Sequence, residues 1–555
     1  LYKGTNILPM RAQGLVDMGR EPLFLFFKHF ISLLTRAPSM EKKTHTDISE
    51  SKPPDEKIHL ESINHVSYDH IIREQELAPT MTLVFHLESA LLKSPSLFPY
   101  FMLVAFGAGG PLRAFLLLLL YPLACLVGHE MGLKMMVFVC FFGVKKHRFR
   151  VGDAVLPKHF LEDIGSEGFN VVDMRWGKRV AISDLPNVMV GGLLRDYMGI
   201  EGVLGRELVE FNGYCLGVMK GRKTDFLEEV LNKSERACSD VLCFGSSLSK
   251  FLDQKRSFNH CKVYQVTNSE KEKWQLLPRK RYPKPLIFHD GRLAFRPTPA
   301  ATLALFMWIP LGIFLSFFRI VIGTSLPFSV FYPMLAFSGF TLVTTGLPDP
   351  PPTGSNHKGT VKPKGKLYVC NHKTVFDPIS IRLALKNHPL SAVTYSISKF
   401  TAVISPIKTV NLTRDRDSDR RIIDNLLSQG DLVLCPEGTT CREPYLLRFS
   451  PLFTEMSDEI VPVAVNVEAS MFYGSTASGS KWLDPVFHLG SPRPTAHIKF
   501  LGKVSTSCCD GGGQKSRFET ANYVQREIAM ALGFECTSLT RKDKYMILAG
   551  NSGIL

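Results

Sequence analysis

A histidine and an aspartate, His372 and Asp377, lie five residues apart in the segment KLYVCNHKTVFDP, just after a short apolar run. A histidine held at one ring nitrogen by a carboxylate can accept a hydroxyl proton at the other nitrogen. On one regular helix, five residues at ~100° each would separate the side chains by ~140°, so they would not share a face. The pair can therefore meet only if the backbone turns between them, as at a strand-to-helix junction.

Two further blocks in the same region carry groups that bind anions and hydroxyls. NLTRDRDSDRR contains Arg414 and Arg416, whose guanidinium groups suit a phosphate monoester. LVLCPEGTTCREP places Glu437, Gly438 and Thr439 directly after an apolar run, where backbone amides and a hydroxyl can hold an anion or a polyol. Taken singly, these blocks also fit a solvated charge run and an ordinary turn.

The elements that must position these residues alternate along the chain. Strands are predicted at KLYVCN, SAVTYSI, DLVLCPEG and EIVPVAVN. Helices are predicted at DSDRRIIDNLLSQG, closed by Gly430, and at about 517–532. Pro462 lies inside EIVPVAVN and favours an edge or ligand-lining strand over a central one. The order predicts an α/β sheet with ligand groups at the strand ends.

A second strand end with chemical residues occurs in the first half of the chain. The apolar run of TLVFHLESALL, a strand candidate at 81–87, leads into His86 and Glu88, and RVAIS (179–183) is another strand candidate that ends in Ser183. A family resemblance described below implies that the first strand shares a sheet with segments at 170–290. In that case the apolar zone between them must leave the sheet and return on one side of any membrane.

Composition indicates a membrane-associated protein with more than one domain. The 555 residues are 45% apolar and carry a formal charge of +15, with basic clusters beside two apolar zones at about 98–143 and 299–343. Residues 21–36 are apolar but short, which favours an interfacial anchor or packed helix. Twelve cysteines without a C-x-x-C pair indicate reduced thiols in a cytosol-facing protein. No motif supports nucleic-acid binding.

The four blocks, in this order and spacing, resemble the glycerolipid acyltransferase family, whose signature is N-H-x4-D, an arginine block, P-E-G-T and a V-P-V strand. The wording is closer still to the land-plant glycerol-3-phosphate acyltransferases that acylate the sn-2 hydroxyl. The segments that resemble them are CNHKTVFDP, LTRDRD, GDLVLCPEGTTCREPYLLRFSPLF and LTRKDKYMILAG. The resemblance covers about residues 80 to 550. Lys373 and Phe376 stand where relatives often carry Arg and Leu.

The resemblance implies acyl transfer from acyl-CoA, a co-substrate, to glycerol-3-phosphate, with no metal, no cofactor and no covalent enzyme intermediate. The implied roles are His372 as base, Asp377 orienting it, Arg414 and Arg416 on the phosphate, Glu437, Gly438 and Thr439 at the acceptor, and Pro462 on the acyl-CoA side. Amides near 437–440 are candidates to stabilise the tetrahedral oxygen.

The same family resembles haloacid dehalogenase (HAD)-like phosphatases in its N-terminal domain, where a strand ends in D-x-D-G-T. His86 and Glu88 stand at the nucleophile and acid positions, so the aspartyl-phosphate and the pair of Mg²⁺-binding carboxylates are lost. Ser183 retains the hydroxyl motif. Ser246 and Lys250 replace metal-binding acids in FGSSLSK. The resemblance implies a silent phosphatase domain.

The expected fold class is α/β: a degenerate HAD-like Rossmannoid domain plus an α/β acyltransferase domain, with membrane-associated helices. The expected divisions are an N-terminal segment and linker (1–75), the HAD-like domain (76–295) with its apolar insertion at about 98–143, a transmembrane hairpin (296–345) and the acyltransferase domain (346–555).

The expected location is the endoplasmic reticulum, with the catalytic domain facing the cytosol; a mitochondrial membrane remains an alternative. Lysophosphatidic acid acylation and a silent membrane scaffold remain alternatives for the function. A phosphatase is disfavoured by His86 and Ser246. The sequence leaves the oligomeric state open.

Overall fold

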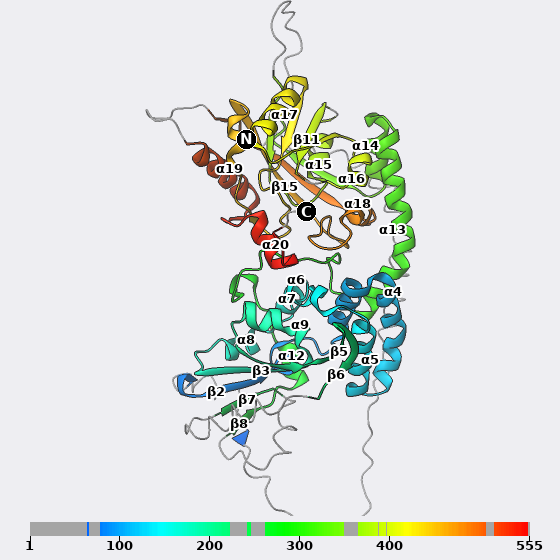
Figure 1. Cartoon of the computed structure of the whole chain (residues 1–555), viewed down its shortest axis with the longest axis vertical. Coiled ribbons are helices and arrows are strands. Elements are labelled where there is room, and N and C mark those ends of the chain that lie inside the picture. The colour runs from blue at the N-terminus through cyan, green and yellow to red at the C-terminus, as the bar shows by residue number, and fades with distance from the viewer. Residues whose placement is uncertain are drawn as a thin grey trace, which may run out of the picture. The chain divides into compact units, whose positions relative to one another are not determined.

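The computed structural model describes residues 64–65, 78–221, 241–245, 261–348, 364–386, 388–395, 397–506 and 516–552 (Figure 1). Contacts divide the chain into two compact units. The described residues of the N-terminal unit fall in Pro9–Pro285 and Pro297–Leu303, and those of the C-terminal unit fall in Leu286–Arg296 and Ala304–Leu555. The apolar segment 21–36 lies outside the described residues.

A six-stranded sheet forms the centre of the N-terminal unit. Its order is β1 (Asn64–His65), β8 (Cys261–Tyr264), β7 (Val241–Phe244), β2 (Thr82–His86), β3 (Lys178–Pro186) and β4 (Gly202–Arg206), and every pair is parallel. All five residues of β2 are buried, as expected for a central parallel strand. The predicted strands at 81–87 and 179–183 are confirmed, and they lie in one sheet.

Short helices and one hairpin complete this unit. They are α6 (Val151–Ala154), α7 (Leu156–Leu161), α8 (Ser166–Val172), α9 (Asn187–Gly191), α12 (Asn268–Lys273), and the hairpin β5 (Leu208–Phe211) with β6 (Tyr214–Met219). A π-helical turn, Leu87–Leu91, follows β2 directly.

The first apolar zone folds into two helices that pack against each other, α4 (Phe98–Leu126) and α5 (His129–Phe141). Arg113 Nη1 donates to the Cys140 carbonyl at 2.8 Å, and Cys140 Sγ lies 3.2 Å from the Phe101 carbonyl. α4 is long and apolar enough to cross a membrane, whereas the 13 residues of α5 are short of the ~20 that a span needs. The zone leaves the sheet after β2 and returns before β3, as the sequence requires.

An eight-stranded sheet forms the centre of the C-terminal unit. Its order is β12 (Lys408–Asn411), β11 (Leu390–Thr394), β13 (Asp431–Leu434), β10 (Leu367–Cys370), β15 (Glu459–Glu468), β16 (Thr495–Phe500) and β9 (Thr341–Thr345), with β17 (Val504–Ser505) also on β15. The strands from β12 to β15 are parallel, and β16 runs antiparallel to β15. The four predicted strands and the α/β class are confirmed.

Helices cover both faces of this sheet because its central strands alternate apolar side chains between the two faces. Leu367 and Val369 of β10 pack in one buried cluster with α17 and α19, whereas Tyr368 and Cys370 pack in another with α15. The helices are α15 (Asp377–Ala384), α16 (Lys399–Val403), α17 (Arg416–Gln429), α18 (Asp484–Leu489), α19 (Arg517–Leu532) and α20 (Arg541–Ala549). A short pair, β14 (Tyr445–Leu446) with β18 (Glu535–Cys536), lies outside the main sheet.

The second apolar zone contains α13 (Pro299–Ser325) and α14 (Phe328–Phe337). α13 is long and apolar enough to cross a membrane, whereas the ten residues of α14 span ~15 Å, about half of a bilayer core. Arg319 of α13 is buried and donates to the carbonyls of Leu489 and Ser491 at 2.6 and 2.7 Å, and Trp308 Nε1 donates to the Gly490 carbonyl at 2.9 Å.

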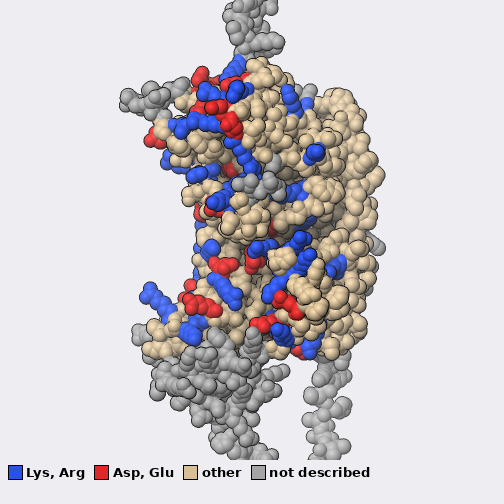
Figure 2. Space-filling model, in the orientation of Figure 1, with Lys and Arg blue, Asp and Glu red and all other residues tan. Residues whose placement is uncertain are grey.

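The opposite face of α13 is apolar and exposed. Phe314 and Phe317 are 70% and 65% exposed, and the surface along α13 in Figure 2 carries no blue or red. A helix with one face bonded to its own domain and an uncharged outer face suits a membrane interface.

Candidate active site

The side chains of His372 and Asp377 meet at the carboxyl end of β10. Residues 371–376 connect β10 to α15, and this connection brings His372 Nδ1 to 2.9 Å from Asp377 Oδ2. The backbone turns between the two residues, as their spacing requires. The next parallel strand, β13, ends beside β10, so Glu437 and its loop lie at the same edge of the sheet.

The Asp377 carboxylate is fully buried and fixed by the turn itself. Its Oδ2 accepts from the Lys373 amide at 2.7 Å, and its Oδ1 accepts from the Thr374 hydroxyl at 2.8 Å. The His372 side chain remains 20% exposed. The arrangement therefore holds Nδ1 rigidly, so that proton transfer would use the other nitrogen, Nε2. The Cys435 thiol is a further hydrogen-bonding neighbour of the imidazole.

The pKa of His372 lies well above its ordinary value. Burial lowers the pKa of His372, whereas the neighbouring Cys435 and Asp377 raise it and prevail. The hydrogen bond with Cys370, together with burial, raises the pKa of the Cys435 thiol well above its ordinary value, so this thiol is neutral near pH 7. We therefore assign the raised pKa of His372 to the Asp377 carboxylate, which stabilises the imidazolium.

Asn371, which the sequence reading did not single out, fixes the start of the turn. Its amide nitrogen donates to the Val465 carbonyl at 2.9 Å, and its carbonyl oxygen accepts from the Val465 amide at 2.8 Å. The side chain thus continues the β10–β15 ladder one step beyond the last backbone pair. Its sequence signals are its place beside His372 and the asparagine of the N-H-x4-D signature.

Glu437 is buried, and its two oxygens both face backbone amides. Oε1 accepts from the His372 amide at 2.7 Å and Oε2 from the Leu447 amide at 2.9 Å. Burial raises the pKa of Glu437 to about 7, while these two amides oppose the shift. The carboxylate joins the β13 loop to the backbone of the histidine, so we propose that Glu437 is a positioning residue.

Glu437→Gln is expected to lower the free energy of unfolding by about 1–3 kcal/mol, because a glutamine amide would face one of the two amide donors with a donor of its own. Activity should fall as well, since the His372 backbone loses its anchor. Denaturant unfolding of the purified variant, beside an activity assay, measures both effects. Unchanged stability would mean that the two amides are satisfied without the carboxylate.

The loop after Glu437 turns through Gly438, which has φ +65°, and continues into Thr439 and Thr440. Lys544 of α20 is buried and donates to the Thr440 carbonyl at 2.6 Å and to its hydroxyl at 3.0 Å. Burial, followed by the charge of Arg442, lowers the pKa of Lys544 to about 8. The Cys441 amide then donates to the His372 carbonyl at 2.7 Å, which returns the loop to the histidine.

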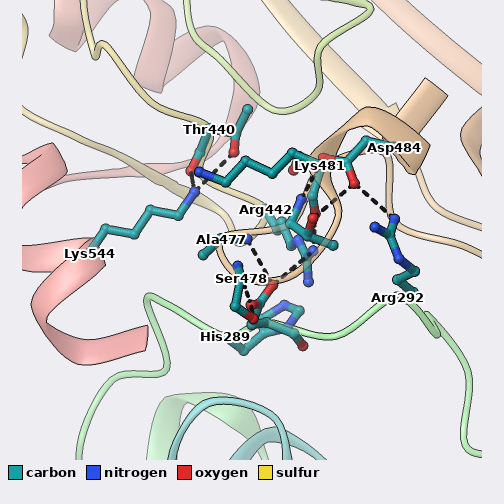
Figure 3. A network of polar contacts seen from close by, with 12 residues as sticks. His289, Arg292, Thr440, Arg442, Ala477, Ser478, Lys481, Asp484 and Lys544 are labelled. Atoms are coloured by element: carbon teal, nitrogen blue, oxygen red, sulfur yellow. Dashed lines mark hydrogen bonds and ion pairs between the residues drawn. The ribbon is translucent and has the colours of Figure 1, made fainter. Parts of the chain in front are cut away.

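A buried polar network holds the far side of this loop, as Figure 3 shows. Asp290 accepts from the amides of Ala477 and Ser478 at 3.0 and 2.9 Å and lies 3.5 Å from Arg442 Nη2. Further pairs are His289 with Glu443 at 2.6 Å, Arg292 with Asp484 at 2.8 Å, and Lys481 with the Tyr545 hydroxyl at 3.0 Å. Segments around 290, 442, 478 and 544 are thereby joined.

Arg414 and Arg416 do not play equivalent structural parts. Arg416 opens α17, and its Nη2 lies 2.6 Å from both oxygens of Glu455. Arg414 is exposed in a left-handed conformation with φ +70°, held by the buried Asp419, which accepts from its amide at 3.1 Å. Strain of this kind in a non-glycine residue is typical of functional positions.

Arg541, at the start of α20, lies within electrostatic reach of Arg414. Burial lowers the pKa of Arg541, and the like charge of Arg414 lowers it further. Two guanidinium groups that repel each other are suited to hold an anion between them. Arg541 lies in LTRKDKYMILAG, a segment that carries the family resemblance, but no local pattern distinguishes this arginine.

The prediction of an edge strand at Pro462 is wrong, because β15 lies between β10 and β16. The alternative, that Pro462 lines a ligand site, stays a prediction. Within a strand, a residue directs its nitrogen and carbonyl to the same neighbour. The Pro462 carbonyl accepts from the Leu501 amide at 2.9 Å, so its nitrogen faces that side too. There β16 has ended at Phe500, and β17 pairs only with residues 459–460. No described strand residue therefore pairs with the nitrogen of Pro462, and the missing N–H costs the sheet no hydrogen bond.

The second strand-end site lies in the N-terminal unit, where His86 is the last residue of β2, Glu88 follows it in the π-helical turn and Ser183 lies in β3. Ser183 Oγ donates to Glu88 Oε1 at 2.5 Å. Among the described residues, one group of histidine and carboxylate side chains could hold a metal ion, and it consists of His86, Glu88 and Asp184. Ser246 and Lys250 lie outside the described residues.

Comparisons with known proteins match both units. A family model described as "Glycerol-3-phosphate acyltransferase RAM2-like, HAD-like domain" matches residues 82–267, and one described as "Acyltransferase" matches residues 355–466. The second match contains the segments of His372, Arg414, Glu437 and Pro462.

Similar proteins come from plants. The chain is 53% identical over 481 residues to "Probable glycerol-3-phosphate acyltransferase 3" of Arabidopsis thaliana, which covers 85% of this chain and 91% of that protein. It is 46% identical over 472 residues to "Glycerol-3-phosphate acyltransferase 1" of the same plant, with 82% and 78% covered. It is 40% identical over 481 residues to "Glycerol-3-phosphate acyltransferase RAM2" of Petunia hybrida, with 84% and 97% covered.

Proposed function

The chain belongs to the plant glycerol-3-phosphate acyltransferases with an N-terminal HAD-like domain, and from this premise we propose that it acylates the sn-2 hydroxyl with acyl-CoA as donor. It is an enzyme, a glycerol-3-phosphate acyltransferase. The observation that carries the proposed mechanism is the His372 Nδ1–Asp377 Oδ2 contact of 2.9 Å at the edge of the sheet.

In the proposed reaction, neutral His372 takes the proton of the glycerol hydroxyl at Nε2 while the hydroxyl oxygen attacks the thioester carbonyl. Asp377 stabilises the imidazolium that forms. When the tetrahedral intermediate collapses, the carbon–sulfur bond breaks, and CoA leaves as the thiolate or takes the proton back from His372. The lipid product is lysophosphatidic acid.

Negative charge on the tetrahedral oxygen needs donors that are already in place. In the described part of the chain, the amides of the buried residues Thr439 and Thr440 donate no hydrogen bond, whereas the Gly438 amide donates to the Cys435 carbonyl at 3.2 Å. The Lys544 contacts and the Figure 3 network fix this loop beside His372. We assign the two threonine amides to the oxyanion.

The phosphate of the acceptor is assigned to Arg414 together with Arg541. α20 carries Arg541 one turn before Lys544, which binds Thr440, and Arg414 lies within electrostatic reach of Arg541. Arg416 is already engaged by Glu455 and would add charge rather than a direct contact.

Arg414→Ala and Arg541→Ala are each expected to raise the KM for glycerol-3-phosphate by ~10–100-fold, the usual loss for a charged hydrogen bond. The effect on kcat should be smaller. Arg416→Ala is the matched control, with a change below ~5-fold, because it removes an exposed ion pair. Steady-state kinetics at saturating acyl-CoA measure all three. If Arg416→Ala raised the KM for glycerol-3-phosphate equally, the phosphate-binding site would have to be assigned to the start of α17 instead.

We also propose that the HAD-like domain has no phosphatase activity, since His86 stands where the family's nucleophilic aspartate would be. Membrane association is supported by α4 and α13, which are the two helices of spanning length and composition within the described ranges. The proposed site is the endoplasmic reticulum, with the catalytic domain facing the cytosol, where glycerol-3-phosphate is soluble.

The product of the full-length protein tests this function. Purified protein receives acyl-CoA and labelled glycerol-3-phosphate, and the products are separated by positional isomer while free phosphate is measured. Lysophosphatidic acid with the acyl group at sn-2 and no phosphate release is expected. An sn-1 product would contradict the regiochemistry. Monoacylglycerol with free phosphate would contradict the silent HAD-like domain.

A further inference from the structure

Three potential metal ligands converge at the carboxyl ends of β2 and β3 in the N-terminal unit. His86 Nε2 lies 3.4 Å from Glu88 Oε2 and 3.4 Å from Asp184 Oδ2. The three ligand atoms all lie within 4.8 Å of one another, and the residues are buried or half-buried. β2 and β3 are parallel neighbours, with His86 opposite Ile182, so the convergence follows from the sheet.

The second polar atom of each of the three side chains is held or faced by another group. His86 Nδ1 lies 3.0 Å from Ser89 Oγ, and in the tautomer that donates to this hydroxyl, Nε2 presents its lone pair. Glu88 Oε1 accepts from Ser183 Oγ at 2.5 Å and from the Asp184 amide at 3.0 Å, which turns Oε2 towards His86. Asp184 Oδ1 lies 3.6 Å from Arg206 Nη2.

The distances favour a metal ion over a shared proton. A charge-assisted hydrogen bond between imidazolium and carboxylate would bring the heavy atoms to ~2.7–2.9 Å. Both contacts here are 3.4 Å. Ligands at ~2.0–2.2 Å from a tetrahedral zinc ion lie ~3.3–3.6 Å from one another. Glu88 Oε2, moreover, is buried and makes no hydrogen bond, which is costly for a carboxylate oxygen unless a cation lies beside it.

We propose that His86, Glu88 and Asp184 bind one divalent transition-metal ion of the Zn²⁺ type. An imidazole with two carboxylates suits Zn²⁺, whereas Mg²⁺ prefers oxygen ligands alone. The replacements that remove the phosphatase nucleophile thus build a different site, contrary to the expectation that the chain binds no metal. The ion would cross-link β2 to β3, with a fourth position open to water.

The residues around the site support its geometry without being ligands. Lys271 Nζ donates to the Glu88 carbonyl at 2.6 Å and fixes the π-helical turn. Arg206 also pairs with Glu130, whose two oxygens each lie 2.6 Å from a guanidinium nitrogen of Arg206. The positive charge of Arg206 is therefore divided between Glu130 and Asp184.

Metal analysis of the full-length protein tests the site. Protein stripped with a chelator is titrated with Zn²⁺ alone, and bound metal is counted after desalting. His86→Ala and Glu88→Gln should each bind one Zn²⁺ fewer per chain than the unsubstituted protein. His497→Ala is the matched control, because it removes an exposed histidine 3.3 Å from Glu468 and should leave the count unchanged.

Ser89→Ala separates positioning from ligation without touching a ligand. Loss of the hydroxyl behind His86 should weaken Zn²⁺ binding ~10–100-fold while the limiting stoichiometry stays the same. Co²⁺ in place of Zn²⁺ should give ligand-field absorption without a thiolate charge-transfer band. The proposal would be overturned if the His86→Ala variant bound as many Zn²⁺ ions as the unsubstituted protein. It would also be overturned if the only Co²⁺ signal were a thiolate band that persisted in this variant.

Discussion

His372→Ala is expected to lower kcat for acylation of glycerol-3-phosphate by ~10²–10⁴-fold, the range that a positioned general base contributes. The KM for glycerol-3-phosphate should change little, since the arginines assigned to the phosphate remain. Initial rates of lysophosphatidic acid formation by purified protein measure the effect. Folding should be preserved, because the imidazole is 20% exposed and the turn is held by Asn371 and Asp377.

The control is again His497→Ala, which lies on β16 of the same sheet and should retain full activity. Activity in His372→Ala close to that of the unsubstituted protein would remove the proposed mechanism. A loss shared by both variants would point to a general effect on the fold instead.

Asp377→Asn is expected to change both the rate and its dependence on pH. The carboxylate raises the pKa of His372, and the base must be neutral, so kcat/KM should rise with pH through this elevated pKa. Without the negative charge the pKa of His372 falls, and the rising limb moves to lower pH. The plateau should be ~10²–10⁴-fold lower, because the imidazolium formed during proton transfer is no longer stabilised.

A full pH profile of kcat/KM for glycerol-3-phosphate distinguishes this from a purely structural loss. An amide at position 377 also places a donor near the Lys373 and Thr374 amides, so stability should decrease as well. If the plateau of kcat/KM were lower but the rising limb stayed at the same pH, the limb would not reflect the titration of His372.

The sequence was sufficient to predict the sheet elements and the meeting of His372 with Asp377. Apolar runs ended by polar motifs define parallel strands well, and a five-residue spacing excludes a single helix face. The central position of the strand with Pro462 could not be predicted, because local sequence does not reveal that β16 ends and β17 begins beside the Pro462 nitrogen.

Other residues of the site could not be found from local patterns at all. His289 and Asp290 reach the catalytic loop from ~150 residues earlier in the chain, and Lys544 from ~100 residues later. Only tertiary structure brings such segments together. The group at His86 was interpreted as a loss of function because the family pattern identifies missing acids, whereas Asp184 becomes a neighbour only through the pairing of β2 and β3.

The bonds that fasten α13 to residues 489–491 have a kinetic consequence. They connect α13 to the end of α18, whose His488 stacks on Phe376 at 4.6 Å, within the turn that contains His372. The apolar helix and His372, the proposed base, therefore belong to one continuously packed body. An acyl donor dissolved in a bilayer would reach this histidine by lateral diffusion in the lipid plane. The rate would then follow the mole fraction of the donor in that plane, and inert lipid would slow the enzyme by surface dilution.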